Sequence, residues 1–124
     1  MSIDLVSQIW DTRGVKAAIF HPAARAVIRL FPEDVRRELG KAVFDLQKGD
    51  VLPMPLSRPM PSIAAGAAEL RIRDRSGIYR AFYYSRSPRG ILIFHAFVKK
   101  SQTTPKHELE LGKKRLEELL HEEI

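Results

Sequence analysis

The chain has 124 residues, no cysteine and a formal net charge of +6, with a pI near 9.9. This length suits a single core, so we expect one domain over residues 1–124. The absence of cysteine excludes disulfides, thiolate nucleophiles and cysteine-bound zinc. No apolar run approaches a membrane span, and the N-terminus lacks the basic and apolar regions of a signal peptide. We therefore expect a cytoplasmic protein.

The net charge is concentrated in one segment. Residues 69–100 carry eight lysines and arginines against two acids, whereas the rest of the chain carries thirteen basic and thirteen acidic residues. A charge this localised indicates a site for a polyanion, either a nucleic acid or an acidic protein.

The N-terminal part predicts a strand followed by two helices. The apolar run 15–20 fits a strand, and Pro22 fits the first turn of a short helix over 21–30. A longer helix begins at Pro32 and ends near Gly49, with an apolar face at spacings of three and four: Val35, Leu39, Ala42, Val43 and Leu46. We expect the two helices to form an antiparallel hairpin.

Residues 51–67 predict a surface loop or flap, because four of the eight prolines fall there and proline interrupts both helices and strand ladders. Three strand candidates follow, at 69–74, 78–84 and 91–98. The last is apolar on both faces, which favours a central position in the sheet.

The C-terminus predicts a helix that Thr104 caps and whose first turn contains Pro105. Gly112 interrupts its apolar stripe and indicates a close approach of another element. The fold class is therefore α+β in the order β-α-α-β-β-β-α, a small antiparallel-meander sheet with an N-terminal helical hairpin and a C-terminal helix.

The strand alternation places charged side chains on one face. Leu70 and Ile72 must face the core, so Arg71 and Arg73 lie on the other face beside Glu69. The next strand adds Arg80, Phe82 and Tyr84 to that face. Arginines among aromatic rings suit single-stranded RNA, in which they bind phosphate and stack on bases. The alternative is that these arginines only keep a surface strand soluble.

Three further side chains can each be interpreted in two ways. Lys99 and Lys100 end the third strand, and they either bind phosphate beside the following helix or are simply solvated. His95 lies within that strand and is either a hydrogen-bonded structural residue or part of a catalytic site. No histidines have metal-ligand spacing with a carboxylate partner, so we expect no metal.

Several segments together resemble the phage-derived, HigB-like branch of the RelE/ParE toxins. They are Glu69-Leu-Arg-Ile-Arg, then Tyr79-Arg80 followed by Phe82-Tyr83, then Phe94-His-Ala-Phe-Val-Lys-Lys-Ser-Gln-Thr-Thr-Pro105. The likeness covers nearly the whole chain, and it is specific as a combination rather than segment by segment.

The resemblance implies a RelE-like fold and the toxin of a toxin–antitoxin pair that cuts messenger RNA on the ribosome without a metal or other cofactor. In such enzymes the 2′-hydroxyl attacks the adjacent phosphate. By this resemblance, Arg80, Lys99 and Lys100 are catalytic, with Glu69, His95 or a lysine as the base, and Arg71 and Arg73 line the groove. The expected partners are the ribosome, mRNA and a helix-turn-helix antitoxin.

Two other functions fit the same resemblance. One is a ParE-like toxin that inhibits DNA gyrase without cutting nucleic acid. The other is a phage remnant that has lost toxicity and whose basic face only binds an acidic partner.

Overall fold

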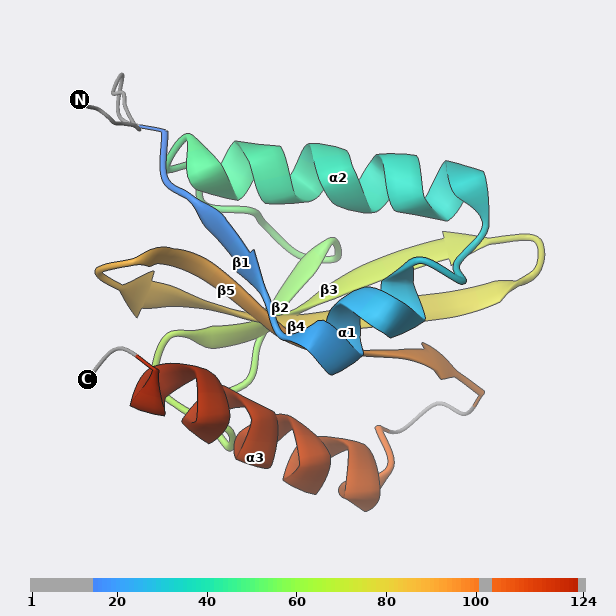
Figure 1. Cartoon of the computed structure of the whole chain (residues 1–124). Helices are drawn as coiled ribbons and strands as arrows, with labels where there is room; N and C mark the ends of the chain where they lie inside the picture. The colour runs from blue at the N-terminus through green and yellow to red at the C-terminus, as the bar shows by residue number, and fades with distance from the viewer. Residues whose placement is uncertain (1–14, 101–103, 123–124) are drawn as a thin grey trace.

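The computed structural model describes residues 15–100 and 104–122 and consists of a five-stranded sheet between two helical layers (Figure 1). Helices α1 and α2 cover one face of the sheet, and α3 covers the other. In chain order the elements are β1 (Ala18–Phe20), α1 (Pro22–Ile28), α2 (Glu33–Gln47), β2 (Ser57–Pro59), β3 (Ala67–Asp74), β4 (Gly77–Ser87), β5 (Gly90–Lys99) and α3 (Lys106–His121). The α+β prediction is confirmed.

The sheet has the strand order β1-β5-β4-β3-β2. Strands β3, β4 and β5 form the predicted antiparallel meander, and β5 is an interior strand, paired with β1 and β4, as expected of a strand that is apolar on both faces. Strand β1 instead pairs parallel with β5, with Ala18 opposite Ile91, so the sheet is mixed. The parallel pairing is possible because α1 and α2, with the strands after them, provide the long connection that parallel strands require.

The proline-rich segment 51–67 is not only a loop, and in this respect the prediction was wrong. Residues 57–59 form β2, which pairs antiparallel with β3. Pro59 is tolerated because β2 is an edge strand, where a missing N–H need not break a ladder. A 2.6 Å hydrogen bond between the Ser57 and Tyr83 hydroxyls ties β2 to the sheet, and Gly66, at φ 90°, allows the turn into β3.

The core divides into two clusters, one on each face of the sheet. The predicted apolar face of α2 is buried in the first cluster. Helix α1 packs on β5, and α2 packs on β3 and β5. The two helices therefore rest side by side on the sheet more than on each other, because the sheet offers the larger apolar surface.

Helix α3 closes the second cluster, which contains three phenylalanines of the sheet, Phe82, Phe94 and Phe97. The predicted Thr104 cap was wrong, because the N-cap is Pro105 and no side chain caps the helix. The close approach at Gly112 is confirmed. A Cβ at this position would lie 2.9 Å from Cδ2 of Phe82 and 3.5 Å from Cε1 of Phe94.

We expect Gly112→Ala to destabilise the protein by about 1–2 kcal/mol, because overpacking against a buried ring outweighs the gain in helix propensity. The matched control is Gly40→Ala in α2, where an added Cβ meets nothing within 4 Å. That variant should gain up to about 1 kcal/mol. Urea unfolding of both variants checks the prediction, and a stabilised Gly112→Ala protein would contradict it.

Candidate nucleic-acid interface

The predicted charged face exists. Arg71 lies directly opposite Arg80 across β3 and β4, and Glu69 lies opposite Phe82. Residues opposite each other in a ladder share a face, so Arg71, Arg80 and Glu69 all project on the α3 side of the sheet. Arg73 joins them by strand alternation. Helix α3 covers the aromatic part of this face, and the arginines occupy the part that it leaves open.

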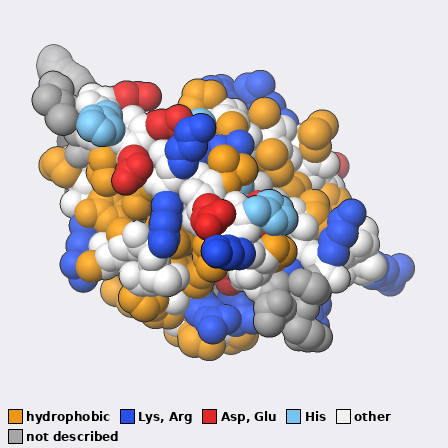
Figure 2. Space-filling model, turned by 90° about the horizontal axis from the view of Figure 1, so that it is seen from below, with side chains coloured by type: hydrophobic (Ala, Val, Ile, Leu, Met, Phe, Trp, Pro, Cys, Tyr) orange, Lys and Arg blue, Asp and Glu red, His pale blue; other side chains and the backbone are white. Residues whose placement is uncertain are grey.

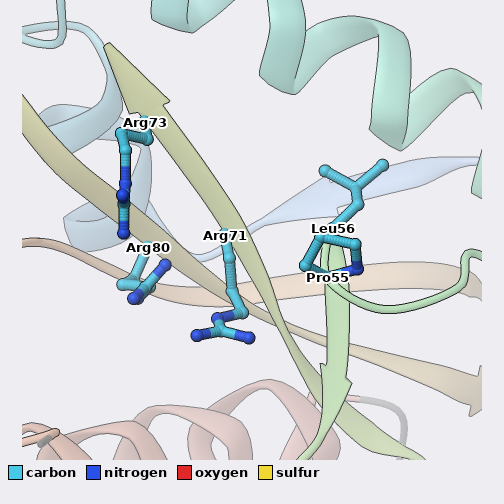
Figure 3. A pocket seen from close by; sticks show the side chains of 5 residues that line it. All are labelled: Pro55, Leu56, Arg71, Arg73 and Arg80. Atoms are coloured by element: carbon cyan, nitrogen blue, oxygen red, sulfur yellow. The ribbon is translucent and has the colours of Figure 1, made fainter. Parts of the chain in front are cut away.

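The arginines line a hollow of about 440 Å³, which we call the arginine pocket (Figure 3). Its lining residues are Pro55, Leu56, Arg71, Arg73 and Arg80. The first two come from the segment before β2, and the arginines come from β3 and β4. Guanidinium groups in a fork geometry bind phosphate oxygens well, so the pocket suits a phosphodiester.

Glu69 lies beneath the arginines and is only 1% exposed. Its carboxylate oxygens are 3.8 Å from Nε of Arg71 and 3.6 Å from Nε of Arg80. Both distances exceed a good hydrogen bond. In the described part of the chain, Oε2 of Glu69 and these two Nε atoms are the buried side-chain atoms without a hydrogen-bond partner. One carboxylate therefore faces several cations and does not neutralise them.

Arg58 belongs to this site, although it was not among the residues predicted from the sequence. It lies on β2 directly opposite Glu69, so it projects on the same face. It is also close enough to lower the pKa of Arg80 and of Lys99 by charge repulsion. Its short strand lies among prolines and shows no alternation, so no local pattern could place it.

Lys99, the last residue of β5, also joins the site, whereas Lys100 follows the strand and is exposed. Lys99 is 6% exposed. Burial lowers its pKa, and repulsion from Arg80 lowers it further, against an opposing effect of Glu69. Burial likewise lowers the pKa of Arg80. A lysine with a lowered pKa can exchange a proton nearer to neutral pH than an ordinary one.

His95 is held by two side chains of α3. Arg115 donates to its Nδ1 at 2.8 Å, and its Nε2 lies 2.7 Å from Oε1 of Glu108. A guanidinium can only donate, so Nδ1 is the acceptor and Nε2–H donates to the carboxylate. Both ring nitrogens are occupied by hydrogen bonds, which fits the first of the two alternatives for His95, a hydrogen-bonded structural residue. The partner Glu108 comes from α3, so the sequence around His95 in β5 does not reveal it.

The buried state of His95 predicts a loss of stability in mild acid. Burial lowers its pKa, although the hydrogen bond to Glu108 opposes this effect, while Arg115 and His107 add repulsion. The folded pKa is below the unfolded value of about 6.5, so unfolding takes up a proton as the pH falls. Stability is fully present above that value and declines below it, by at most about 1.4 kcal/mol per pH unit for one proton.

Urea unfolding at several pH values between neutral and mildly acidic conditions checks this prediction. His95→Gln serves as the comparison, because it removes the titrating ring and should flatten the decline. An equal decline in both proteins would assign the effect to other groups.

The two aromatic residues predicted to stack on RNA have different positions. Phe82 is 0% exposed and packs under α3, so a base cannot reach it in this structure. The strand alternation placed it on the correct face, but α3 covers that part of the face. Tyr84 is partly buried against the same cluster.

The outer surface of α3 differs from the arginine pocket. Acidic, basic and histidine side chains are interspersed on this side of the molecule (Figure 2). On α3 they include Lys106 and Glu110, which form an exposed ion pair four residues apart. Such mixing is typical of a solvated helix surface, so it does not extend the polyanion site.

A comparison with protein families matches residues 26–117 to "Phage derived protein Gp49-like (DUF891)". The chain belongs to this family. The Gp49-like family is part of the RelE/ParE-like toxin group, which confirms the predicted superfamily and phage origin. No curated protein matches the chain. In the described ranges, no helix is long and apolar enough to cross a membrane.

Proposed function

We propose that this protein is the toxin of a type II toxin–antitoxin system and cleaves messenger RNA on the ribosome, in the manner of the HigB-like branch. The observation that supports this most is the arginine pocket together with a buried lysine near its arginines. Three arginines converge on a volume of about 440 Å³, and Lys99 has a lowered pKa. The first feature fits a phosphodiester, and the second fits a proton transfer beside it.

The reaction assigned to this site is an attack within the RNA strand. The 2′-oxygen bonds to the adjacent phosphorus, the bond from phosphorus to the 5′-oxygen breaks, and a 2′,3′-cyclic phosphate and a 5′-hydroxyl result. Arg71 and Arg80 bind the phosphate oxygens and stabilise the charge that develops on them. The neutral form of Lys99 accepts the 2′-hydroxyl proton, and solvent protonates the 5′-oxygen. Lys100 attracts the neighbouring phosphate.

His95 and Glu69 have other roles in this proposal. Both nitrogens of His95 are engaged with α3, so it fixes that helix beside the pocket. Glu69 lies behind the arginines. A single titratable amine gives modest intrinsic activity, and binding in the ribosomal A site would supply the positioning of the RNA.

The proposed partners follow from the activity. A cytoplasmic enzyme that cuts the host's messenger RNA must be neutralised until it is needed, so we propose a cognate antitoxin, a small helix-turn-helix protein encoded beside this gene. We propose that the reaction uses no metal and no other cofactor.

The second candidate is a ParE-like inhibitor of DNA gyrase. The structural role of His95 and the burial of Glu69 favour it, because they leave few groups for acid–base chemistry. A binding module needs only the basic surface.

Controlled expression in a bacterial host, followed by mapping of mRNA ends, separates the candidates. We expect growth arrest and new breaks inside codons, with 2′,3′-cyclic phosphate ends. Intact transcripts together with an induced DNA-damage response would support the gyrase inhibitor. Normal growth with intact transcripts would leave only the phage-remnant function.

A further inference from the structure

Glu69 is the one acidic side chain that the described strands place on the arginine face. An acid weakens a site for polyanions, and burial of a carboxylate is costly unless it is paired. Glu69 is nevertheless 1% exposed and lies between Arg58, Arg71 and Arg80. Solvation of the carboxylate therefore does not explain why an acid lies at this position.

The contacts of Glu69 are made with the inner nitrogen of each guanidinium. The nearest atom is Nε for both Arg71 and Arg80, at 3.8 Å and 3.6 Å. A guanidinium has two further nitrogens, which carry four of its five N–H groups. Both arginines line the pocket (Figure 3), whereas Glu69 is not among its lining residues, so a contact at Nε leaves the outer nitrogens for a ligand.

We propose that Glu69 is a positioning residue, a buried counter-ion that holds Arg71 and Arg80 from behind as a two-arginine clamp for one phosphodiester. Glu69 does not touch the ligand in this arrangement. The inference deepens the proposed function, on which it rests, by assigning the organisation of its phosphate site.

Three further observations support the clamp. Arg71 and Arg80 are direct cross-strand partners, and like charges in that position repel unless an acid lies between them. Glu69 opposes the lowering of the Arg80 pKa by burial and so favours the charged guanidinium. The distances between the Glu69 carboxylate oxygens and the two Nε atoms are too long for strong hydrogen bonds, so each guanidinium keeps much of its charge for the ligand.

The experiment depends on the fact that net charge and arginine positioning predict opposite changes in RNA affinity for Glu69→Gln. Glu69→Gln raises the net charge by one, which by charge alone should tighten the binding of any polyanion. Loss of a positioning residue should weaken it. The probe is a short single-stranded RNA with 2′-O-methyl groups on every sugar, which cannot be cleaved through its 2′-oxygens. Fluorescence anisotropy over a range of salt concentrations gives affinity and salt dependence.

We expect Glu69→Gln to bind the probe about tenfold more weakly, because displaced arginines would lose charge-assisted hydrogen bonds to the phosphate of the probe. The slope of log K against log salt should fall by about 0.7, the value for one phosphate contact on a single strand. The matched control is Glu38→Gln, which makes the same charge change on α2, in a neighbouring hollow that Arg73 also lines. It should bind as tightly as the wild type, or slightly more tightly.

Equal or tighter binding by folded Glu69→Gln, with an unchanged slope, would overturn the clamp while leaving the proposed function to the cleavage assay. If Glu69→Gln does not fold, Glu69→Asp decides, because it keeps the charge but withdraws it by one methylene. Weaker binding by this variant supports the clamp, and wild-type binding overturns it. A wild-type protein that does not bind the probe would also overturn the clamp, and the cleavage assay on ribosomes would still decide the proposed function.

Discussion

Arg80→Ala is expected to lower the rate of mRNA cleavage by at least about 100-fold, the usual effect of removing a group that stabilises charge in the transition state. Arg80 lies on β4 between the other two long strands, lines the arginine pocket and is 5% exposed. Its backbone pairs with a strand on each side, and its Nε lies 3.6 Å from a carboxylate oxygen of Glu69. The side chain is therefore preorganised in a way that an exposed arginine is not.

The measurement is the cleavage of mRNA on programmed ribosomes, with growth of expressing cells as a second readout. Arg75→Ala is the matched control, because it removes the same charge from the exposed turn between β3 and β4. It should retain nearly full activity. Arg80→Lys should fall between the two, because it keeps the charge but loses the fork of donors. A fully toxic Arg80→Ala protein would refute the site assignment.

The common face of Arg71, Arg73 and Arg80 could be predicted from the sequence. Leu70 and Ile72 had to enter the core, and the two-residue period of a strand then placed their neighbours on the other side. The antiparallel meander followed from short turns between adjacent strands. Both predictions depend on local patterns, which explains why they were correct.

The remainder of the site depends on contacts between distant elements. Arg58 lies opposite Glu69 only because a three-residue strand pairs with β3. Phe82 was predicted to contact RNA, but α3 comes so close at Gly112 that it buries the ring. Glu108 and Arg115 hold His95 from a helix that begins after the strand ends. No periodicity within one segment encodes these pairings.

The pairing of β5 with β4 also departs from simple strand alternation. The register shifts between Phe82 and Tyr83 of β4, which pair with His95 and Ile93. Phe94 and His95 therefore both contact the α3 side, where simple alternation would place them on opposite faces. The bulge lets the strand present phenylalanine to the core and then His95 and Lys99 to the polar part of the same face.

Lys99→Met is expected to have opposite effects on stability and activity. Lys99 is a buried cation near Arg58, Arg71 and Arg80, with Glu69 as the opposing acid. Replacing a buried charge by an apolar side chain of similar length removes repulsion and desolvation, so we expect stabilisation of about 1 kcal/mol and a Tm higher by roughly 4 °C. Cleavage should fall by about 100-fold, because the proposed base is lost.

The pH dependence of cleavage tests the role of Lys99 separately from its charge. Only the neutral amine accepts a proton, so the wild-type rate should rise with pH and level off at a pKa below the ordinary lysine value. The residual activity of Lys99→Met should lack this rise. Lys113→Met on the exposed side of α3 is the control and should change neither the Tm nor the pH profile.

A rise with pH that persists in Lys99→Met would assign the base to another group, whereas a lower Tm of this variant would mean that the buried amine stabilises the fold. Because evolution tolerates an unfavourable buried cation chiefly where it has a function, a stabilised but inactive Lys99→Met protein would connect the buried charge of this sheet directly to its chemistry.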